Sequence, residues 1–64
     1  MEITHRTTRK LASGTFREFR TADNSTYREM PVKGWCKAVQ AGYGWAWRRV
    51  SKQAAERCEA AWNQ

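Results

Sequence analysis

The sequence predicts a small α+β domain in which an antiparallel sheet of three to four strands carries one C-terminal helix on one face. Three observations lead to this fold class. Extended segments separated by turn signals occupy residues 1–32, residues 33–50 have the pattern of a β-hairpin, and residues 51–64 have the pattern of a helix. A chain of 64 residues is expected to form a single small domain, 1–64.

The first half of the chain is expected to be extended. Residues 1–12 are rich in threonine and arginine and poor in apolar side chains, so they are predicted to form a flexible arm or an edge strand. Residues 15–32 fit two extended segments around the turn signal "ADNS". The spacing of Phe16 and Phe19 leaves a short helical turn as the alternative. Pro31 cannot donate a backbone hydrogen bond, so it marks an edge strand or its end.

The clearest hairpin follows, with "KGWCKAVQ" and "YGWAWRRV" as strands joined around "AGYG". Because side chains alternate between the two faces of a strand, each strand presents two sets of residues. One face of the first strand carries Trp35, Lys37 and Val39. In the second strand, Tyr43, Trp45, Trp47 and Arg49 alternate with Gly44, Ala46, Arg48 and Val50.

The segment "SKQAAERCEAAWNQ" predicts the helix. Ser51 is a suitable N-cap, because its hydroxyl can accept a hydrogen bond from an amide of the first turn. Helical spacing gathers one apolar stripe, composed of Ala54, Ala55, Cys58, Ala61 and Trp62. This stripe is mostly alanine, so the helix can approach a sheet closely.

A helix with small side chains needs bulky residues opposite it. We therefore expect Trp45 and Trp47 to pack beneath the helix, which would leave Arg48 on the open face of the sheet. In the alternative arrangement Ala46 and Val50 face the helix, and the two tryptophans point outward.

Charge gives the strongest indication of function. Twelve lysines and arginines face six acidic residues, for a net charge of +6 and an isoelectric point near 10.0. Such a balance in a short chain favours an anionic partner, either a nucleic acid or an acidic protein. A membrane partner is not expected, because the helix has only one bulky anchor, Trp62.

Catalytic and metal-binding functions lack a signature. The chain has one histidine, His5, and its two cysteines match no zinc-binding spacing, so we expect no enzyme activity, no metal and no cofactor. Cys36 and Cys58 are expected to be reduced and partly buried in a cytoplasmic protein, the alternative being one disulfide in an exported chain. The N-terminal stretch has no apolar region of the kind found in signal peptides.

The stretch "SKQAAERCEAAW" after a hairpin resembles the end of double-stranded-RNA-binding domains, where a third strand leads into an alanine-rich helix that opens with Ser-Lys. The resemblance covers about the last 30 residues. It implies that Lys52 contacts a phosphate. The chain departs from that family at Gln53 and Glu56, where the family prefers lysine, and it has no counterpart of the family's first helix.

These observations predict a small basic nucleic-acid-binding module, for DNA or RNA, that contacts the phosphate backbone from the hairpins and the helix start. The candidate residues are Arg17, Arg20, Lys37, Arg48, Arg49 and Lys52. The alternative is a small protein-binding or inhibitory module, phage-derived or homodimeric, that mates with an acidic partner. Tryptophan and arginine are common at the energetic centres of such interfaces.

Overall fold

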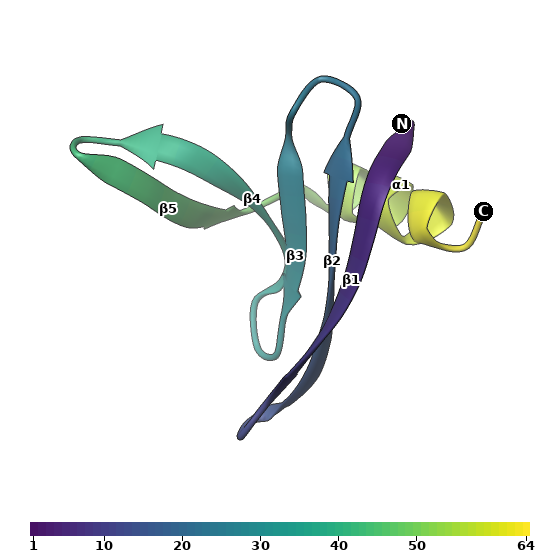
Figure 1. The fold of residues 1–64 in the computed structure, drawn as a ribbon, viewed down its shortest axis with the longest axis horizontal. Coiled ribbons are helices and arrows are strands. Elements are labelled where there is room, and N and C mark those ends of the chain that lie inside the picture. The colour runs from purple at the N-terminus through teal and green to yellow at the C-terminus, as the bar shows by residue number, and fades with distance from the viewer.

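A computed structural model describes residues 1–64 and contains one antiparallel sheet and one helix (Figure 1). The five strands follow one another across the sheet in chain order, each paired with the next. They are β1 (Ile3–Leu11), β2 (Gly14–Thr21), β3 (Thr26–Met30), β4 (Gly34–Ala41) and β5 (Gly44–Arg49). The helix α1 spans Lys52–Trp62. The α+β class is confirmed, and the sheet has five strands where the sequence predicted three to four, because β1 pairs with β2 along most of its length.

The turns follow the local sequence signals. Asp23 accepts a hydrogen bond of 3.1 Å from the Ser25 amide in the β2–β3 turn, and Asn24 has the positive φ of 68° that asparagine tolerates. β3 ends at Met30, directly before Pro31. A two-residue turn joins β4 to β5, with Gly42 at a φ of 57°. The prediction of two extended segments around "ADNS" is confirmed, and residues 14–21 form a strand with no helical turn at Phe16.

The main hydrophobic core lies between α1 and one face of the sheet. Phe19, Trp35 and Cys58 form its centre, and the partly buried residues packed around them are Ile3, Tyr27, Val50, Ala55 and Trp62. The predicted apolar stripe of the helix is confirmed, with Cys58 and Ala61 buried. The predicted N-cap is confirmed as well, because Ser51 Oγ accepts a 3.2 Å hydrogen bond from the Ala54 amide.

The orientation predicted for the hairpin tryptophans is wrong. Residues paired across two strands share a face, and Trp47 pairs with Ala38, so it lies on the face opposite to Trp35 and the helix. Trp45, two residues earlier in the same strand, points the same way and is 74% exposed. Bulk beneath the helix comes instead from Phe19 and Trp35.

The same register corrects the expectation for the arginines of β5. Arg48 pairs with Lys37, and Lys37 lies over the ring of Tyr27, which packs against the core beneath the helix. Arg48 is therefore on the helix side of the sheet, although exposed, and it is not on the open face. Arg49 shares the outward face with the two tryptophans.

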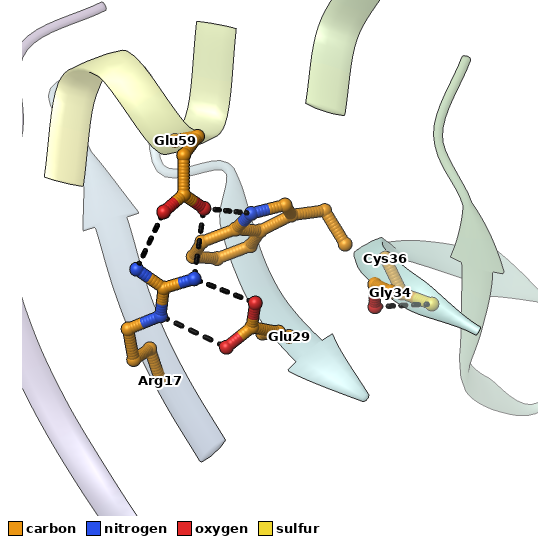
Figure 2. Close-up of polar contacts among 6 residues, drawn as sticks. Arg17, Glu29, Gly34, Cys36 and Glu59 are labelled. Carbon is orange, nitrogen blue, oxygen red and sulfur yellow. Dashed lines mark hydrogen bonds and ion pairs between the residues drawn. The ribbon is translucent and has the colours of Figure 1, made fainter. Parts of the chain in front are cut away.

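A polar network ties the helix to the sheet (Figure 2). Arg17 on β2 donates hydrogen bonds of 2.8 and 2.6 Å to Glu29 on β3, and bonds of 3.0 and 2.8 Å to Glu59 on α1. Trp35 Nε1 donates a further 3.0 Å bond to Glu59. These bonds raise the pKa of Arg17 and lower the pKa of Glu59, so both groups are held in their charged forms. The network fixes the middle of α1 over β2–β4.

The first strand holds the far end of the helix. Arg6 donates hydrogen bonds to the last carbonyl groups of the chain, at 2.6 Å to Trp62, 3.3 Å to Ala61 and 3.1 Å to Gln64. Its guanidinium also lies 5.3 Å from the centre of the Trp62 ring. A positive charge at the C-terminal end of a helix is favourable because the unpaired carbonyls there carry partial negative charge. Residues 3–11 are thus an edge strand and not a flexible arm.

The helix α1 is also too short and too polar to cross a membrane.

Both cysteines are buried and unbridged. Burial raises the pKa of the Cys58 thiol to about 11, because the interior disfavours a thiolate. Cys58 therefore contributes to the core as a small apolar side chain.

Candidate functional site

The face of the sheet that α1 leaves uncovered, which we call the open face, is polar and aromatic. Pairing across the strands assigns one row of residues to it: Glu18, Arg28, Cys36 and Arg49. Strand alternation adds further residues to the same face: Arg20, Thr26, Ala38, Trp45 and Trp47.

Arg28 organises the middle of the open face. Its Nε and Nη2 atoms both lie 2.7 Å from Glu18 Oε1, and Arg9 Nε lies 3.4 Å from the same oxygen. The guanidinium carbon is 4.4 Å from the centre of the Trp47 ring and 5.1 Å from that of Phe16, which is only 3% exposed. Arg28 therefore covers Phe16, supports one face of Trp47 and neutralises Glu18 within the protein.

Trp45 lies at the edge of this arrangement and is largely uncovered, with 74% of its surface exposed. It borders a groove of about 440 Å³, whose lining residues are Arg20, Asn24, Thr26, Ala38, Trp45 and Trp47. Exposing so large an apolar ring to water is unfavourable in the isolated protein. An exposed tryptophan beside a groove is a common feature of a binding surface.

The groove arises from the unequal lengths of neighbouring strands. β3 pairs with β4 only from Tyr27–Lys37 to Met30–Gly34, while β4 continues to Ala41. The β4–β5 hairpin consequently projects away from β1, β2 and β3, as Figure 1 shows. The angle between this hairpin and the β2–β3 turn leaves the hollow that Arg20 and Trp45 border.

A second hollow adjoins the first on the same face. It has a volume of about 220 Å³ and is lined by His5, Thr7, Glu18, Phe19, Arg20 and Thr26. The two hollows share Arg20 and Thr26. Arg20 therefore stands at the junction, exposed and without a carboxylate partner among the ion pairs.

The structure divides the six basic residues predicted from the sequence among several places. Arg20 and Arg49 lie on the open face. Lys37 and Arg48 lie opposite each other on the helix side. Arg17 is engaged by Glu29 and Glu59, so its hydrogen-bonding groups are occupied within the protein. We therefore leave Arg17 out of the candidate site.

The sixth predicted residue, Lys52, lies at the start of the helix. Together with Arg49 and Lys33 it contributes to the lining of a hollow of about 450 Å³. Lys33 was not among the residues predicted from the sequence. Lys33 lies in the β3–β4 turn, 19 positions before Lys52 in the chain. The fold brings this turn to the start of the helix, so both lysines line the same hollow.

Ion pairing leaves most of the positive charge available. Only Arg9, Arg17 and Arg28 of the twelve basic residues form ion pairs, so nine have no carboxylate partner. The carboxylates are scattered, and no three side chains among His, Cys, Asp and Glu are close enough to hold a metal ion. Most of the positive charge of the protein is therefore not neutralised by ion pairs within the chain.

The sequence did not identify the aromatic part of this site. The sequence predicts that Trp45 and Trp47 lie in the core, and it does not predict the supporting role of Arg28. Alternation alone places the two tryptophans on one face, but it does not say which face the helix covers. The pairing of Trp47 with Ala38 settles that question.

Comparison with protein-family models, with curated proteins and with solved structures finds no match to this chain. The resemblance of its last 30 residues to double-stranded-RNA-binding domains stays a prediction.

Proposed function

We propose that this protein is a small nucleic-acid-binding module that contacts the phosphate backbone through arginine and lysine side chains. The observation that carries the proposal is the open face, where Arg20 and Arg49 accompany an exposed Trp45 beside a groove. Such surfaces combine cations, which replace the counterions of the phosphates, with flat side chains that pack on bases or sugars.

The distribution of charge supports this proposal. The one carboxylate assigned to the open face, Glu18, is neutralised by Arg9 and Arg28. Arg49 also lines the hollow at the helix start, beside Lys33 and Lys52. A ligand that reaches both places would meet Arg20, Arg49 and Lys52, three of the residues that the sequence predicted.

Salt dependence tests the proposal directly. Binding of a fluorescent oligonucleotide would be measured between about 50 and 200 mM salt, and log affinity should fall steeply and linearly with log salt. Arg20→Ala and Arg49→Ala should each weaken binding and reduce the slope by roughly 0.7–0.9, the change for one lost phosphate contact. Absence of binding at low salt would overturn the proposal.

Arg57→Ala is the matched control. Arg57 is exposed on α1 and lines neither of the two hollows of the open face, and its removal changes the net charge by the same amount. The affinity of the Arg57→Ala variant for the oligonucleotide should equal that of the unaltered protein. A loss as large as that of Arg20→Ala would mean that overall charge, and not the open face, determines binding.

A protein-binding or inhibitory module with an acidic partner is the second candidate. It is favoured by the exposed aromatic tip of the β4–β5 hairpin, where Tyr43 is fully exposed beside Trp45. A homodimer is included in this candidate, because β1 and β5 are both unpaired edges of the sheet. Purification with and without nuclease separates the candidates, since a protein complex survives nuclease treatment.

A cytoplasmic location is part of the proposal. Cys36 and Cys58 are both unbridged, and reduced cysteines are typical of that compartment. Fractionation of cells that produce the tagged protein would test this location.

A further inference from the structure

We infer that the open face binds unpaired, single-stranded nucleic acid, with a base stacked on Trp45 and phosphates on Arg20 and Arg49. This inference rests on the proposed function and names its ligand more closely. Trp45 is 74% exposed and borders the groove on the open face.

Stacking on an aromatic side chain requires a base whose own faces are accessible. In a duplex both faces of a base are occupied by its neighbours in the stack, whereas in a single strand they can be exposed to the protein. A duplex would therefore use the cations of the open face and leave the Trp45 ring unused. Only a single strand makes use of both features.

The groove beside Trp45 has the size and lining for such a base. Its volume of about 440 Å³ lies within the range of sites that hold small organic ligands. Its lining includes the small side chain of Ala38, the hydroxyl of Thr26 and the amide of Asn24. These groups can both donate and accept hydrogen bonds, as the edge of an unpaired base requires.

The groove is held in shape before any ligand arrives. Trp47 forms part of its lining and rests on Arg28, which is fixed in turn by two hydrogen-bonding contacts to Glu18. Trp45, two residues before Trp47, lies on the same strand face, roughly 6.8 Å along the strand. A surface that needs little rearrangement loses less free energy when it binds.

Charge complementarity decides in favour of a polyanion. No carboxylate lines the groove beside Trp45, and Arg20 lines both this groove and its neighbour. Arg49 lies two residues beyond Trp47 on the same strand face, so cations lie on two sides of the aromatic pair. A strand crossing the open face would place phosphates near each cation and a base between them.

The test compares a mixed-sequence 12-nucleotide single strand with a duplex of the same sequence, at equal phosphate concentration and low salt. The unaltered protein should bind the single strand more tightly. Trp45→Ala should weaken single-strand binding by about 5- to 150-fold, the usual effect of losing one stacked base, and leave duplex binding unchanged. Tyr43→Ala is the control, because Tyr43 is an exposed aromatic of the same hairpin that does not line the groove.

The outcomes separate this inference from the proposed function. If single strand and duplex bind equally and Trp45→Ala affects neither, the inference is wrong while the proposed function stands. If Tyr43→Ala weakens binding as much as Trp45→Ala, the groove is not the stacking site and the inference is wrong. If neither nucleic acid binds, both fail. Circular dichroism and thermal unfolding of each variant show whether it is folded.

Discussion

Arg17 and Glu59 are 42 residues apart in the chain and are joined by two hydrogen bonds, of 3.0 and 2.8 Å. The same guanidinium binds Glu29 through two more, so one arginine joins two strands to the helix (Figure 2). Paired bonds of this kind match the planar fork of arginine, which lysine cannot reproduce. The helix therefore docks on the sheet through a polar network beside the apolar core.

Removing Arg17 should destabilise the fold. Arg17→Ala leaves Glu29 and Glu59 without their partner, and we expect the free energy of unfolding to fall by about 2 kcal/mol, as for the loss of hydrogen bonds to a charged group. Arg17→Lys keeps the charge but not the paired geometry and should recover only part of the loss. Urea unfolding measures the free energy of unfolding of both variants.

The control for this series is Arg48→Ala, at an exposed arginine without an ion pair. It should change the free energy of unfolding by less than about 0.5 kcal/mol. Equal stabilities of Arg17→Ala and Arg48→Ala would contradict a structural role for Arg17.

Acid should weaken the docking of the helix. Hydrogen bonds from Arg17 and Trp35 lower the pKa of Glu59 below its ordinary value of 4.5. Because the folded pKa is the lower one, the stabilisation is complete above pH 4.5 and is lost as the pH falls through the folded pKa. The free energy of unfolding, measured with urea at several pH values from 6 to 2, should therefore fall less steeply for Glu59→Gln than for the unaltered protein.

Asp23 contributes to the same acid range and needs its own control. A hydrogen bond from the Thr21 hydroxyl, with others from Ser25, lowers the pKa of Asp23. Asp23→Asn separates its contribution from that of Glu59. Identical acid profiles for Glu59→Gln and the unaltered protein would exclude Glu59 as a source of the acid sensitivity.

Alkali should destabilise the core through Cys58. Burial raises the pKa of this thiol from 9.0 to about 11, so its contribution to stability is complete below pH 9.0 and is lost as the pH rises through about 11. The loss is about 3 kcal/mol, from a shift of about two pKa units at about 1.4 kcal/mol each. Cys58→Ala should flatten the fall in Tm between pH 8 and pH 11, and an equally steep fall would disprove this explanation.

The contact between Arg6 and the helix end should protect the last turn from opening. Arg6→Ala removes three hydrogen bonds to carbonyl groups and the contact with the Trp62 ring. Hydrogen exchange of the amides of residues 61–64 should become several-fold faster, corresponding to about 1 kcal/mol. Lys10→Ala, an exposed residue of the same strand, should leave this exchange unchanged.

Local sequence signals were sufficient to predict much of the fold. The Ser51 cap, the alanine-rich stripe of α1, the end of β3 before Pro31 and the β4–β5 hairpin all depend on neighbouring residues. The contribution of residues 3–11 was less clear, because Ile3 and Arg6 are fixed by contacts with distant residues of the core and helix. Such contacts leave no pattern within the strand itself.

The error at Trp45 and Trp47 has a similar cause. The alanine stripe correctly indicated that the helix needs bulky partners, but Phe19 and Trp35 on earlier strands already supply them. A shift of one residue in the register between β4 and β5 would move the tryptophans of β5 to the helix side. The two-residue turn at Gly42 and Tyr43 sets this register. The stretch "AGYG" permits more than one turn position, so the sequence alone left both faces open.

The most direct test of the open face as the binding surface uses the four indole N–H signals in a ¹H–¹⁵N spectrum, one for each tryptophan. Titration with a single-stranded 12-nucleotide oligonucleotide should shift the signals of Trp45 and Trp47. The signals of Trp35, which is bonded to Glu59, and of Trp62 should stay in place. Movement of Trp35 or Trp62 with unchanged Trp45 and Trp47 signals would contradict the account.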